Sequence, residues 1–408
     1  MKAVKALQAA AGAHAGYTVL RQGEMLWDGI VVGAGPAGSV AAWLLARAGA
    51  RVLVLEAARF PRDKVCGEAW SPPAGALLRR IGLGAVIAAL PQAALRGMRI
   101  FSPGGRMVQG CYGGALRGAG MRRWHLDAAL AQAARGAGAE LRDGQRVSAA
   151  HEGASGLNLT VVDSTGRATV ERGRVVLGAE GRRTLLGRRL GDLRYDRRYR
   201  RWAIRGHFEG VAGVEDFGEM HVGVPGYVGL CPLGDGLANV CLVIERDRWR
   251  KGLALEPMFR SALAQFPLLA ARMADARPLG PLASVGPLAF GVRHPRRAPA
   301  LLAGDALGFF DPFTGEGGYR ALRSAELAAQ ALAGARAGAP WSRTRRRYLG
   351  QVRRAFAAKE LFQRGLQRLV FPAPRAERVA RALQRFPGAA DRLVQVAADL
   401  RPLRRLLV

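Results

Sequence analysis

Three glycines within six residues, Gly33, Gly35 and Gly38, follow a short apolar run and open an alanine-rich helical stretch. In such a turn the first glycine permits a tight bend, the second lets the backbone approach a pyrophosphate, and the third lets the helix lie close to the strand. The first N–H groups of the helix are free to bind phosphate oxygens. A second apolar run ends on Glu56, 18 residues after Gly38, where a carboxylate can accept hydrogen bonds from ribose hydroxyls. The sequence therefore predicts a dinucleotide site on a strand–turn–helix–strand unit.

Two later stretches have the same setting, an apolar strand followed by glycines and an acid. The first is 178–184, and the second runs from 303 to 318. Because open α/β sheets bind ligands at the carboxyl ends of their strands, both stretches are expected beside the glycine turn. Asp305 is placed to hydrogen-bond the polyol chain of a flavin. The glycines at 315–318 begin a helix whose free N–H groups would face the pyrimidine edge of the flavin ring. The three stretches together predict FAD as the cofactor.

The elements that position these residues come from separate parts of the chain. The fold class predicted is α/β, with a Rossmann-type FAD-binding domain, an inserted β-sheet substrate domain and a helical C-terminus. Separate strands are expected at 168–170 and 174–177, and one helix over 255–273. The expected domain limits are 1–24 for a disordered extension, 25–70, 120–195 and 286–335 for the FAD-binding domain, 71–119 and 196–285 for the substrate domain, and 336–408 for the helical region.

Composition narrows the class of protein. The chain has 408 residues and a formal net charge of +31. A basic surface spread by arginine usage is favoured over a nucleic-acid partner, because no nucleic-acid-binding motif is present. The four cysteines form no CxxC pair, which argues against zinc and for a reducing compartment, so a cytoplasmic protein without a metal site is expected. Residues 29–46 carry no charge, but their proline and glycines indicate the dinucleotide turn rather than a membrane span.

These stretches resemble the flavoprotein group that includes geranylgeranyl reductases and FAD-dependent aromatic hydroxylases. The loop Phe60–Gly67 is similar to the reductase-type loop after the second strand, and Asp311–Gly318 resembles that branch's flavin-contact loop. Arg123 matches an arginine that approaches FAD from a helix. The stretches at 202–210 and 226–227 resemble the substrate-side sheet of the reductases, and the similarity covers roughly residues 27–335. The resemblance and the motifs together predict FAD contacts at Gly33, Gly35, Ala37, Gly38, Glu56, Arg62, Gly67, Arg123, Val147, Gly304, Asp305, Gly315, Gly317 and Gly318.

The sequence departs from the reductase pattern in two places. The middle motif carries Glu180 where the family usually has Asp, which keeps the charge. In the sheet motif, Gly229 and Cys231 stand where the reductases usually have Trp and Phe. Losing these aromatic side chains weakens the case for a geranylgeranyl chain and allows a different or larger substrate.

Cys66 and Tyr227 are the catalytic candidates. The loop that matches the Cys66 region lies near the flavin ring in the family, so the resemblance implies a group beside the substrate double bond, with proton donation as one role. A small side chain that packs the loop is the alternative of equal weight. Lys64 and Glu68 are weaker acid–base candidates in the same loop. His207 and His221 are isolated on expected strands, which favours structural roles.

The function expected is FAD-dependent reduction of a carbon–carbon double bond in a hydrophobic, isoprenoid-like or polyketide-like substrate. Electrons would come from NAD(P)H, visiting transiently, or from a separate reductase partner. One alternative is a monooxygenase that hydroxylates an aromatic or polyketide substrate through a flavin C4a-hydroperoxide. A halogenase is less favoured, since no Trp-x-Trp-x-Ile-Pro element is present, and a non-catalytic flavin- or lipid-binding protein stays open. The tail 341–408 has 17 basic and 4 acidic residues interleaved with apolar ones, which fits either a helical cap or a peripheral membrane contact.

Overall fold

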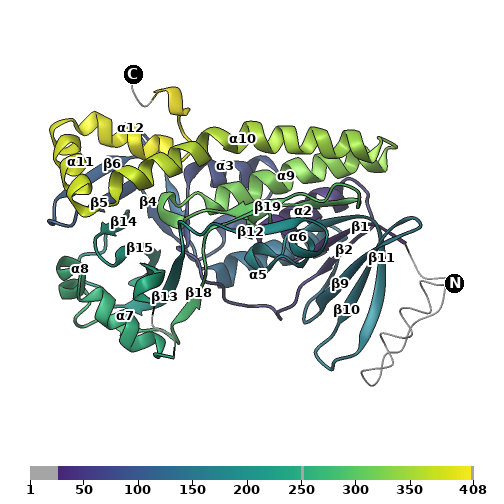
Figure 1. Ribbon diagram of the computed structural model, residues 1–408, viewed down its shortest axis with the longest axis horizontal. Coiled ribbons are helices and arrows are strands. Elements are labelled where there is room, and N and C mark those ends of the chain that lie inside the picture. Colours follow the sequence, from purple (N-terminus) through teal and green to yellow (C-terminus); the bar gives the residue numbers. More distant parts are fainter. Residues whose placement is uncertain (1–25, 250–251, 406–408) are drawn as a thin grey trace.

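The computed structural model describes residues 26–249 and 252–405. One half of the molecule is built on a seven-stranded sheet in the order β8-β2-β1-β11-β10-β9, with β20 beside β11 (Figure 1). The strands β8, β2, β1, β11 and β20 run parallel, and β10 and β9 return antiparallel. Their bounds are β1 (Leu26–Val32), β2 (Val52–Leu55), β8 (Glu140–Arg142), β9 (Arg146–Gly153), β10 (Gly156–Val162), β11 (Ala168–Gly178) and β20 (Ala300–Leu302).

Three helices pack together on this sheet: α2 (Pro36–Arg47), α5 (Arg123–Gly136) and α9 (Gly317–Arg336). The strand β2 is buried along its whole length, as expected for a parallel strand covered on both faces. The helix α2 begins with Pro36 in its first turn, where the missing N–H leaves no hydrogen bond unmade. A Cβ at Gly38 would collide with the carbonyl oxygen of Gly33, so this glycine allows the helix to lie directly against the turn.

The second half is an eight-stranded sheet in the order β17-β13-β16-β15-β14-β5-β6, with β18 beside β13. Its bounds are β5 (Gly97–Phe101), β6 (Met107–Cys111), β13 (Arg201–Glu209), β14 (Phe217–Val222), β15 (Gly226–Gly234), β16 (Leu237–Glu245), β17 (Arg277–Pro278) and β18 (Ala283–Val285). One face buries an apolar cluster against α7 (Leu255–Leu263) and α8 (Pro267–Arg272). The opposite face packs against the loop near Val65, the loop near Phe313 and the end of α10 (Trp341–Val370).

The remaining short elements connect the two halves. Two three-stranded sheets and three short helices have the bounds β3 (Ala69–Trp70), β4 (Ala93–Leu95), β7 (Gly118–Gly120), β12 (Asp192–Tyr195), β19 (Phe290–Arg293), β21 (Gly308–Phe309), α3 (Pro72–Arg80), α4 (Gly84–Ala88) and α6 (Leu185–Arg189).

The chain ends in the helices α10, α11 (Ala373–Arg385) and α12 (Pro387–Ala397). The long helix α10 runs beside α9, and α11 and α12 cover the end of the sheet at β5 and β6 (Figure 1). Pro372 and Pro374 lie before and within the first turn of α11, where proline is tolerated, so they separate two helices without breaking either. Among the described helices none is both long and apolar enough to cross a membrane.

The α/β fold class with its FAD-binding sheet is confirmed, and two local expectations are wrong. Residues 168–178 form one strand, because Gly173 pairs with Leu157 on one side and Trp27 on the other while leaving room for Ile30. The expected helix over 255–273 is two helices, because Phe266 precedes Pro267 and its backbone, with a φ of −119° and a ψ of 74°, is not helical. The domain limits stay a prediction, and the expected extension at 1–24 lies outside the described residues.

Candidate active site

The three sequence motifs meet at the carboxyl edge of the parallel sheet. Gly33 has a φ of +95°, and a Cβ there would lie 2.6 Å from the carbonyl oxygen of Ala179 in the middle motif. Gly304 has a φ of +61°, and a Cβ there would lie 3.0 Å from the methyl group of Ala37. The glycines therefore allow backbone segments from all three motifs to approach one another at the start of α2.

Glu56 lies directly against the glycine turn. Its carboxylate accepts hydrogen bonds from the backbone N–H of Ala34 at 2.8 Å and of Ala58 at 3.1 Å. The guanidinium of Arg62 lies 3.4 Å from the same carboxylate. The predicted ribose-binding acid is thus held at the end of β2, beside the first N–H groups of α2.

Two arginines lie next to the glycine turn and share one buried acid. Arg123 forms two bonds of 2.6 Å with Asp127, one turn along α5, and Arg62 donates to the same carboxylate at 2.7 Å. Burial acts to lower the pKa of Arg123, but Asp127 outweighs it and raises the pKa above the ordinary value. A Cβ at Gly35 would lie 3.7 Å from the Arg123 guanidinium and 3.8 Å from that of Arg62. Two guanidinium groups and a helix N-terminus around an open glycine fit the negative charge of a pyrophosphate.

The second end of the site is formed by the loops before and after β21. Gly315 has a φ of +68°. A Cβ added at Gly315, or at Gly317, the first residue of α9, would meet no other part of the chain within 4 Å. Gly318 is packed instead, since a Cβ there would lie 2.7 Å from the ring of Trp70. Asp305 lies within electrostatic range of Lys64 and Arg182, so three charged groups from three segments gather there. Burial lowers the pKa of Lys64, and Arg123 lowers it further.

These features fit FAD. The glycine turn, Glu56 and the two arginines suit an adenosine diphosphate, and the Asp305 and Gly315 segments lie at the neighbouring strand end, where a flavin chain and ring would extend. Within this arrangement Gly67 is exposed, with open space beside its Cα. Val147 is buried on β9, near the end of β2, where Gln145 donates a backbone hydrogen bond to the carbonyl of Glu56.

Glu180 of the middle motif turns away from the glycine turn. Its carboxylate accepts hydrogen bonds from the Thr184 hydroxyl at 2.8 Å and the Leu185 N–H at 2.7 Å, at the start of α6. Burial raises the pKa of Glu180 to about 7, although these hydrogen bonds favour the charged form. The acid therefore holds the α6 turn together.

Cys66 lies in the loop between β2 and β3, on the Arg123 side of the site. Its sulfur accepts a hydrogen bond from the Glu68 N–H at 3.4 Å, and the Arg123 side chain lies within electrostatic range of the thiol. Its carbonyl oxygen accepts from the Asn239 side chain at 2.9 Å. Cys66 as a residue is partly exposed. Its predicted role beside the substrate stays a prediction.

Tyr227 is buried with its hydroxyl bonded to Asp311. That hydroxyl donates at 2.6 Å, and Asp311 also accepts from Arg201 at 2.9 Å and Gln367 at 2.8 Å. Burial, followed by the charge of Asp311, raises the pKa of Tyr227 well above its ordinary value. These bonds tie β13, β15 and α10 to the start of the Asp311–Gly318 loop. The structure thus relates Tyr227 to the loop rather than to an open surface.

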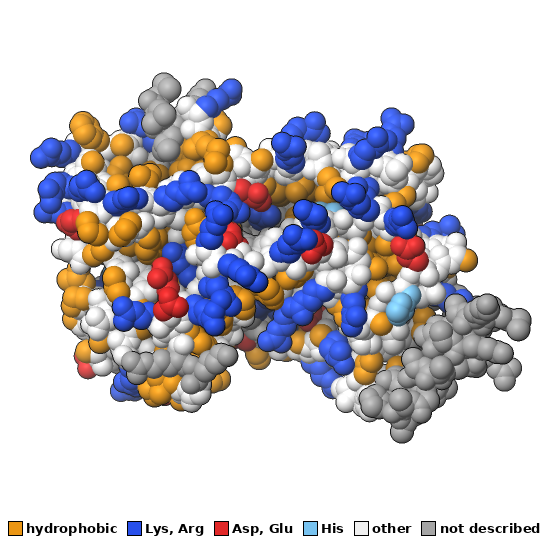
Figure 2. Space-filling view, viewed as in Figure 1, with side chains coloured by type: hydrophobic (Ala, Val, Ile, Leu, Met, Phe, Trp, Pro, Cys, Tyr) orange, Lys and Arg blue, Asp and Glu red, His pale blue; other side chains and the backbone are white. Residues whose placement is uncertain are grey.

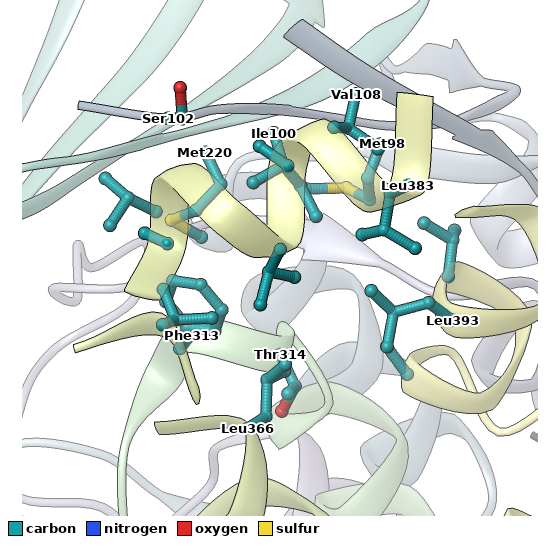
Figure 3. A pocket seen from close by; sticks show the side chains of 17 residues that line it. Met98, Ile100, Ser102, Val108, Met220, Phe313, Thr314, Leu366, Leu383 and Leu393 are labelled. Atoms are coloured by element: carbon teal, nitrogen blue, oxygen red, sulfur yellow. The ribbon is translucent and has the colours of Figure 1, made fainter. Parts of the chain in front are cut away.

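An apolar cavity adjoins that loop. It contains about 780 Å³ of space between side chains, part of it open to solvent, and Phe313 and Thr314 form one wall. Apolar side chains from β5 and β6 and from the three C-terminal helices point into it, including Ile100, Leu383 and Leu393 (Figure 3). Ser102 and Thr314 supply the only hydroxyl groups among its lining residues, and no lining residue is charged. Neither Cys66 nor Tyr227 lines the cavity, although Val65 and Tyr227 pack in the same apolar cluster as Phe313.

A polar cluster that the sequence pattern does not predict lies under the Cys66 loop. Glu68 bonds His207, Asn239 and the first residue of α5, and Arg205 joins His207 to Asp63. Period-two spacing puts Arg205 and His207 on one face of β13, and this spacing is the signal in the sequence that points to the cluster. Asn239 lies opposite His207 on β16, a pairing that requires knowing the sheet register.

The chain belongs to the FAD binding domain family, whose model matches residues 27–360. Menaquinone reductase from Mycobacterium tuberculosis is 31% identical over 336 residues, covering 75% of this chain and 76% of that protein. Digeranylgeranylglycerophospholipid reductase 2 from Methanopyrus kandleri is 30% identical over 327 residues, covering 76% and 77%. Family and relatives together identify a FAD-dependent oxidoreductase of the geranylgeranyl-reductase-like group.

Solved structures share the fold. The flavin-dependent brominase Bmp2 superposes with a TM-score of 0.79 at 20% identity, covering 92% of this chain and 94% of that one. A geranylgeranyl bacteriochlorophyll reductase-like protein from Thermoplasma acidophilum superposes with a TM-score of 0.70 at 21% identity, covering 96% and 94%. At this level of identity the likeness extends to the fold alone, which hosts more than one flavin reaction.

Proposed function

We propose that this protein reduces a carbon–carbon double bond in an isoprenoid-like lipid. The observation that carries the proposal is the apolar cavity beside the Asp311–Gly318 loop, whose lining holds no charged group. Bound FAD would supply the two-electron redox chemistry.

The relatives support the same substrate class. Their names specify menaquinone and digeranylgeranylglycerophospholipid, both of which carry isoprenoid chains. An alkene chain has no polar groups for hydrogen bonds, so it needs an apolar wall and exclusion of water. In this chain Phe313 and Leu366 supply such a wall from the loop and from α10, and α11 closes it with Ala380 and Leu383.

The electron donor is proposed to be NAD(P)H or a separate reductase. Only one complete GxGxxG unit occurs in the sequence, so a nicotinamide would bind transiently rather than in a second Rossmann unit. Supplying NADH, NADPH or a chemical reductant to the FAD-loaded protein under anaerobic conditions, and following flavin bleaching, distinguishes these donors. Bleaching by the chemical reductant alone would indicate a protein partner.

The activity test uses the FAD-loaded, full-length protein reduced under anaerobic conditions. Menaquinone with an unsaturated isoprenoid chain and digeranylgeranylglycerophospholipid are the probes, and products are identified by mass spectrometry. A gain of two hydrogen atoms per double bond supports the proposal. After admission of oxygen, a gain of one oxygen atom would instead support the monooxygenase alternative, and a protein that retains FAD but converts neither probe would contradict the proposed reaction.

A matched pair of variants tests the cavity itself. Ala380 lies on the cavity side of α11 and is buried, whereas Ala382 on the same helix is exposed. Ala380→Phe fills the cavity and is expected to reduce turnover at least tenfold. A tenfold change corresponds to a loss of roughly one kilocalorie per mole of substrate-binding free energy. Ala382→Phe is expected to leave turnover unchanged. Equal turnover in both variants would exclude the cavity as the substrate site.

The outer face of α11 is proposed to meet an anionic lipid surface. Arg375, Arg378, Arg381 and Arg385 are exposed there, and Phe386 is 66% exposed at the helix end. Basic side chains cover much of the molecular face in Figure 2, so the charge alone is not specific to α11. The distinguishing feature is that the apolar cavity lies directly under this helix.

Vesicle flotation tests that surface. Arg378→Glu with Arg381→Glu is expected to weaken binding to phosphatidylglycerol vesicles, with little binding to phosphatidylcholine vesicles in any variant. Arg188→Glu with Arg189→Glu, on α6, has the same change of charge at another exposed site. Equal loss of binding in the two double variants would show that net charge, rather than α11, is responsible.

A further inference from the structure

Glu68 is a buried acid whose carboxylate has three hydrogen-bond donors around it. One oxygen accepts from the backbone N–H of Arg123 at 2.7 Å. The other oxygen lies 2.7 Å from His207 Nε2 and accepts from Asn239 Nδ2 at 2.7 Å. Glu68 is 1% exposed, and its two acceptor oxygens match an environment made of donors.

The hydrogen bond to Arg123 places Glu68 at the start of α5. Arg123 is the first residue of that helix, and no neighbouring side chain caps its N-terminus. A carboxylate at this position satisfies a free helix N–H and is favoured by the helix dipole. Glu68 therefore contacts the turn that carries Arg123, a predicted FAD ligand whose side chain lies within electrostatic range of the Cys66 thiol.

The backbone of Glu68 is itself unusual. Its φ is +60°, in the left-handed region that side-chain-bearing residues rarely adopt. Such a conformation is kept only where the surroundings determine it. Here the carbonyl of Glu68 accepts from the Met121 N–H at 3.0 Å, and its own N–H donates to Cys66. The strained residue is therefore fixed by its backbone as well as by its carboxylate.

His207 transmits the contact to the other end of the loop. Arg205 lies 3.1 Å from His207 Nδ1, and because arginine can only donate, Nδ1 must be the acceptor. The ring proton is then on Nε2, which donates to Glu68. Arg205 also donates to Asp63 at 2.6 Å. The loop is therefore held to β13 at two acids, Asp63 and Glu68, on either side of Cys66.

We propose that Glu68 is a positioning residue that fixes the Cys66 thiol and the first turn of α5 relative to the eight-stranded sheet. It acts with Asp63, Arg205, His207 and Asn239, which we call the loop anchor. Asn239 reinforces it, since the same amide donates to Glu68 and to the Cys66 carbonyl. The inference deepens the proposed function, in which Cys66 is the candidate group beside the substrate. Its test measures the accessibility of the Cys66 thiol, so it succeeds or fails independently of the reaction.

The test compares Glu68→Gln with a control on the same sheet. Glu219 is also a buried acid paired with a histidine and an arginine, but it has no contact with the Cys66 loop. Iodoacetamide labelling of Cys66 in the FAD-loaded protein is followed by peptide mass spectrometry. In Glu68→Gln an amide NH₂ group replaces one carboxylate oxygen and faces other donors, so one buried hydrogen bond is lost. Labelling of Cys66 is expected to become about tenfold faster. Glu219→Gln is expected to leave the rate unchanged.

Two further variants keep the proposal falsifiable if Glu68→Gln does not fold. Asn239→Ala removes the donor shared by Glu68 and the Cys66 carbonyl and is expected to speed labelling as well. Glu68→Asp keeps the charge and is expected to restore part of the protection. Unchanged Cys66 labelling in the folded Glu68 and Asn239 variants, or an equal rise in Glu219→Gln, would overturn the proposal.

Discussion

Two buried glutamate–histidine pairs lie on opposite faces of the same eight-stranded sheet, and they differ in what else they contact. On one face Glu68 joins His207, with Arg205 behind the histidine. On the other face Glu219 lies 2.9 Å from His221 Nε2, and the Arg272 guanidinium donates to Glu219 at 2.7 Å. The residue types are the same, and both glutamates and both histidines are buried.

The difference lies in the sequence separation of the partners. Glu219 and His221 are two residues apart on β14, and Arg272 ends α8, so this pair closes the sheet against its own helices. Glu68 is 139 residues from His207 and 171 from Asn239, and it also bonds α5 of the other half. A buried pair thus becomes relevant to a site through the segments that it joins, and residue type alone does not reveal this.

The largest effect is expected from removing each acid. Glu68→Ala and Glu219→Ala both leave buried donors unpaired, and each is expected to lower the free energy of unfolding by about 3–5 kcal/mol. Only Glu68→Ala is expected to weaken FAD binding, by at least about tenfold, because it releases the turn that carries Arg123. Urea unfolding and a flavin fluorescence titration measure the two quantities. Equal FAD affinity in both variants would remove the distinction between the faces.

The histidines give a second, smaller contrast. His207→Phe leaves Glu68 short of a donor and Arg205 Nη1 without its acceptor, although Arg205 keeps its bond to Asp63, so a loss of about 1–3 kcal/mol in the free energy of unfolding is expected. His221 is stacked on Phe101, with ring centroids 4.3 Å apart, and Glu219 keeps Arg272. His221→Phe preserves stacking and is expected to have a smaller effect. Thermal unfolding of the two variants checks the order, and a reversed order would be evidence against the greater role of His207.

The sequence was informative about the cofactor end of the site because local signals determine it. The turn at Gly33, Gly35 and Gly38 and the acid Glu56 lie within one strand–turn–helix–strand unit, so their geometry follows from their spacing. The same holds for Gly304 and Gly315, whose positive φ values require glycine. At these positions the spacing of glycines in the sequence determines the backbone conformation.

The loop anchor and the cavity could not be predicted in this way. The sequence pattern presents His207 as an isolated residue on a strand, and its partner Glu68 is identified only once the loop and the sheet are brought together. The cavity combines β5, the loop at Phe313 and three C-terminal helices, whose sequence pattern reveals an apolar face but not what that face covers. Tyr227 was proposed from a resemblance, and its bond to Asp311 depends on the same tertiary contact.

Tyr227→Phe is expected to have a modest effect. Asp311 keeps its bonds from Arg201, Gln367 and the Phe313 N–H, so losing one donor is expected to lower the free energy of unfolding by about 1 kcal/mol. If Tyr227 only holds the loop, turnover should fall by no more than a few fold. A loss of two orders of magnitude, with FAD affinity unchanged, would instead make Tyr227 a catalytic residue.

The smallest effect is expected from the exposed end of the anchor. Burial acts to raise the pKa of Asp63, but the hydrogen bond and charge of Arg205 hold it below its ordinary 3.8. A carboxyl with a lowered folded-state pKa contributes stability that is complete above the unfolded-state value and is lost as the pH falls through the folded-state value. In Asp63→Asn the free energy of unfolding is therefore expected to fall less steeply as the pH drops below about 4. Because the Asp63 side chain is 37% exposed, its pair with Arg205 is expected to add less than about 1 kcal/mol at neutral pH.

Asp216 provides the matched control for this last measurement. Its hydrogen bond to Arg96 likewise lowers its pKa below 3.8, and the pair lies at the start of β14, away from the Cys66 loop. In both Asp→Asn variants the free energy of unfolding should fall less steeply with falling pH, because both remove a carboxyl with a lowered pKa. Urea unfolding between about pH 6 and 3 measures this dependence. Only Asp63→Asn should also speed Cys66 labelling. If the two variants label alike, Asp63 contributes charge to the surface and no restraint to the loop, and the anchor reduces to Glu68, His207 and Asn239.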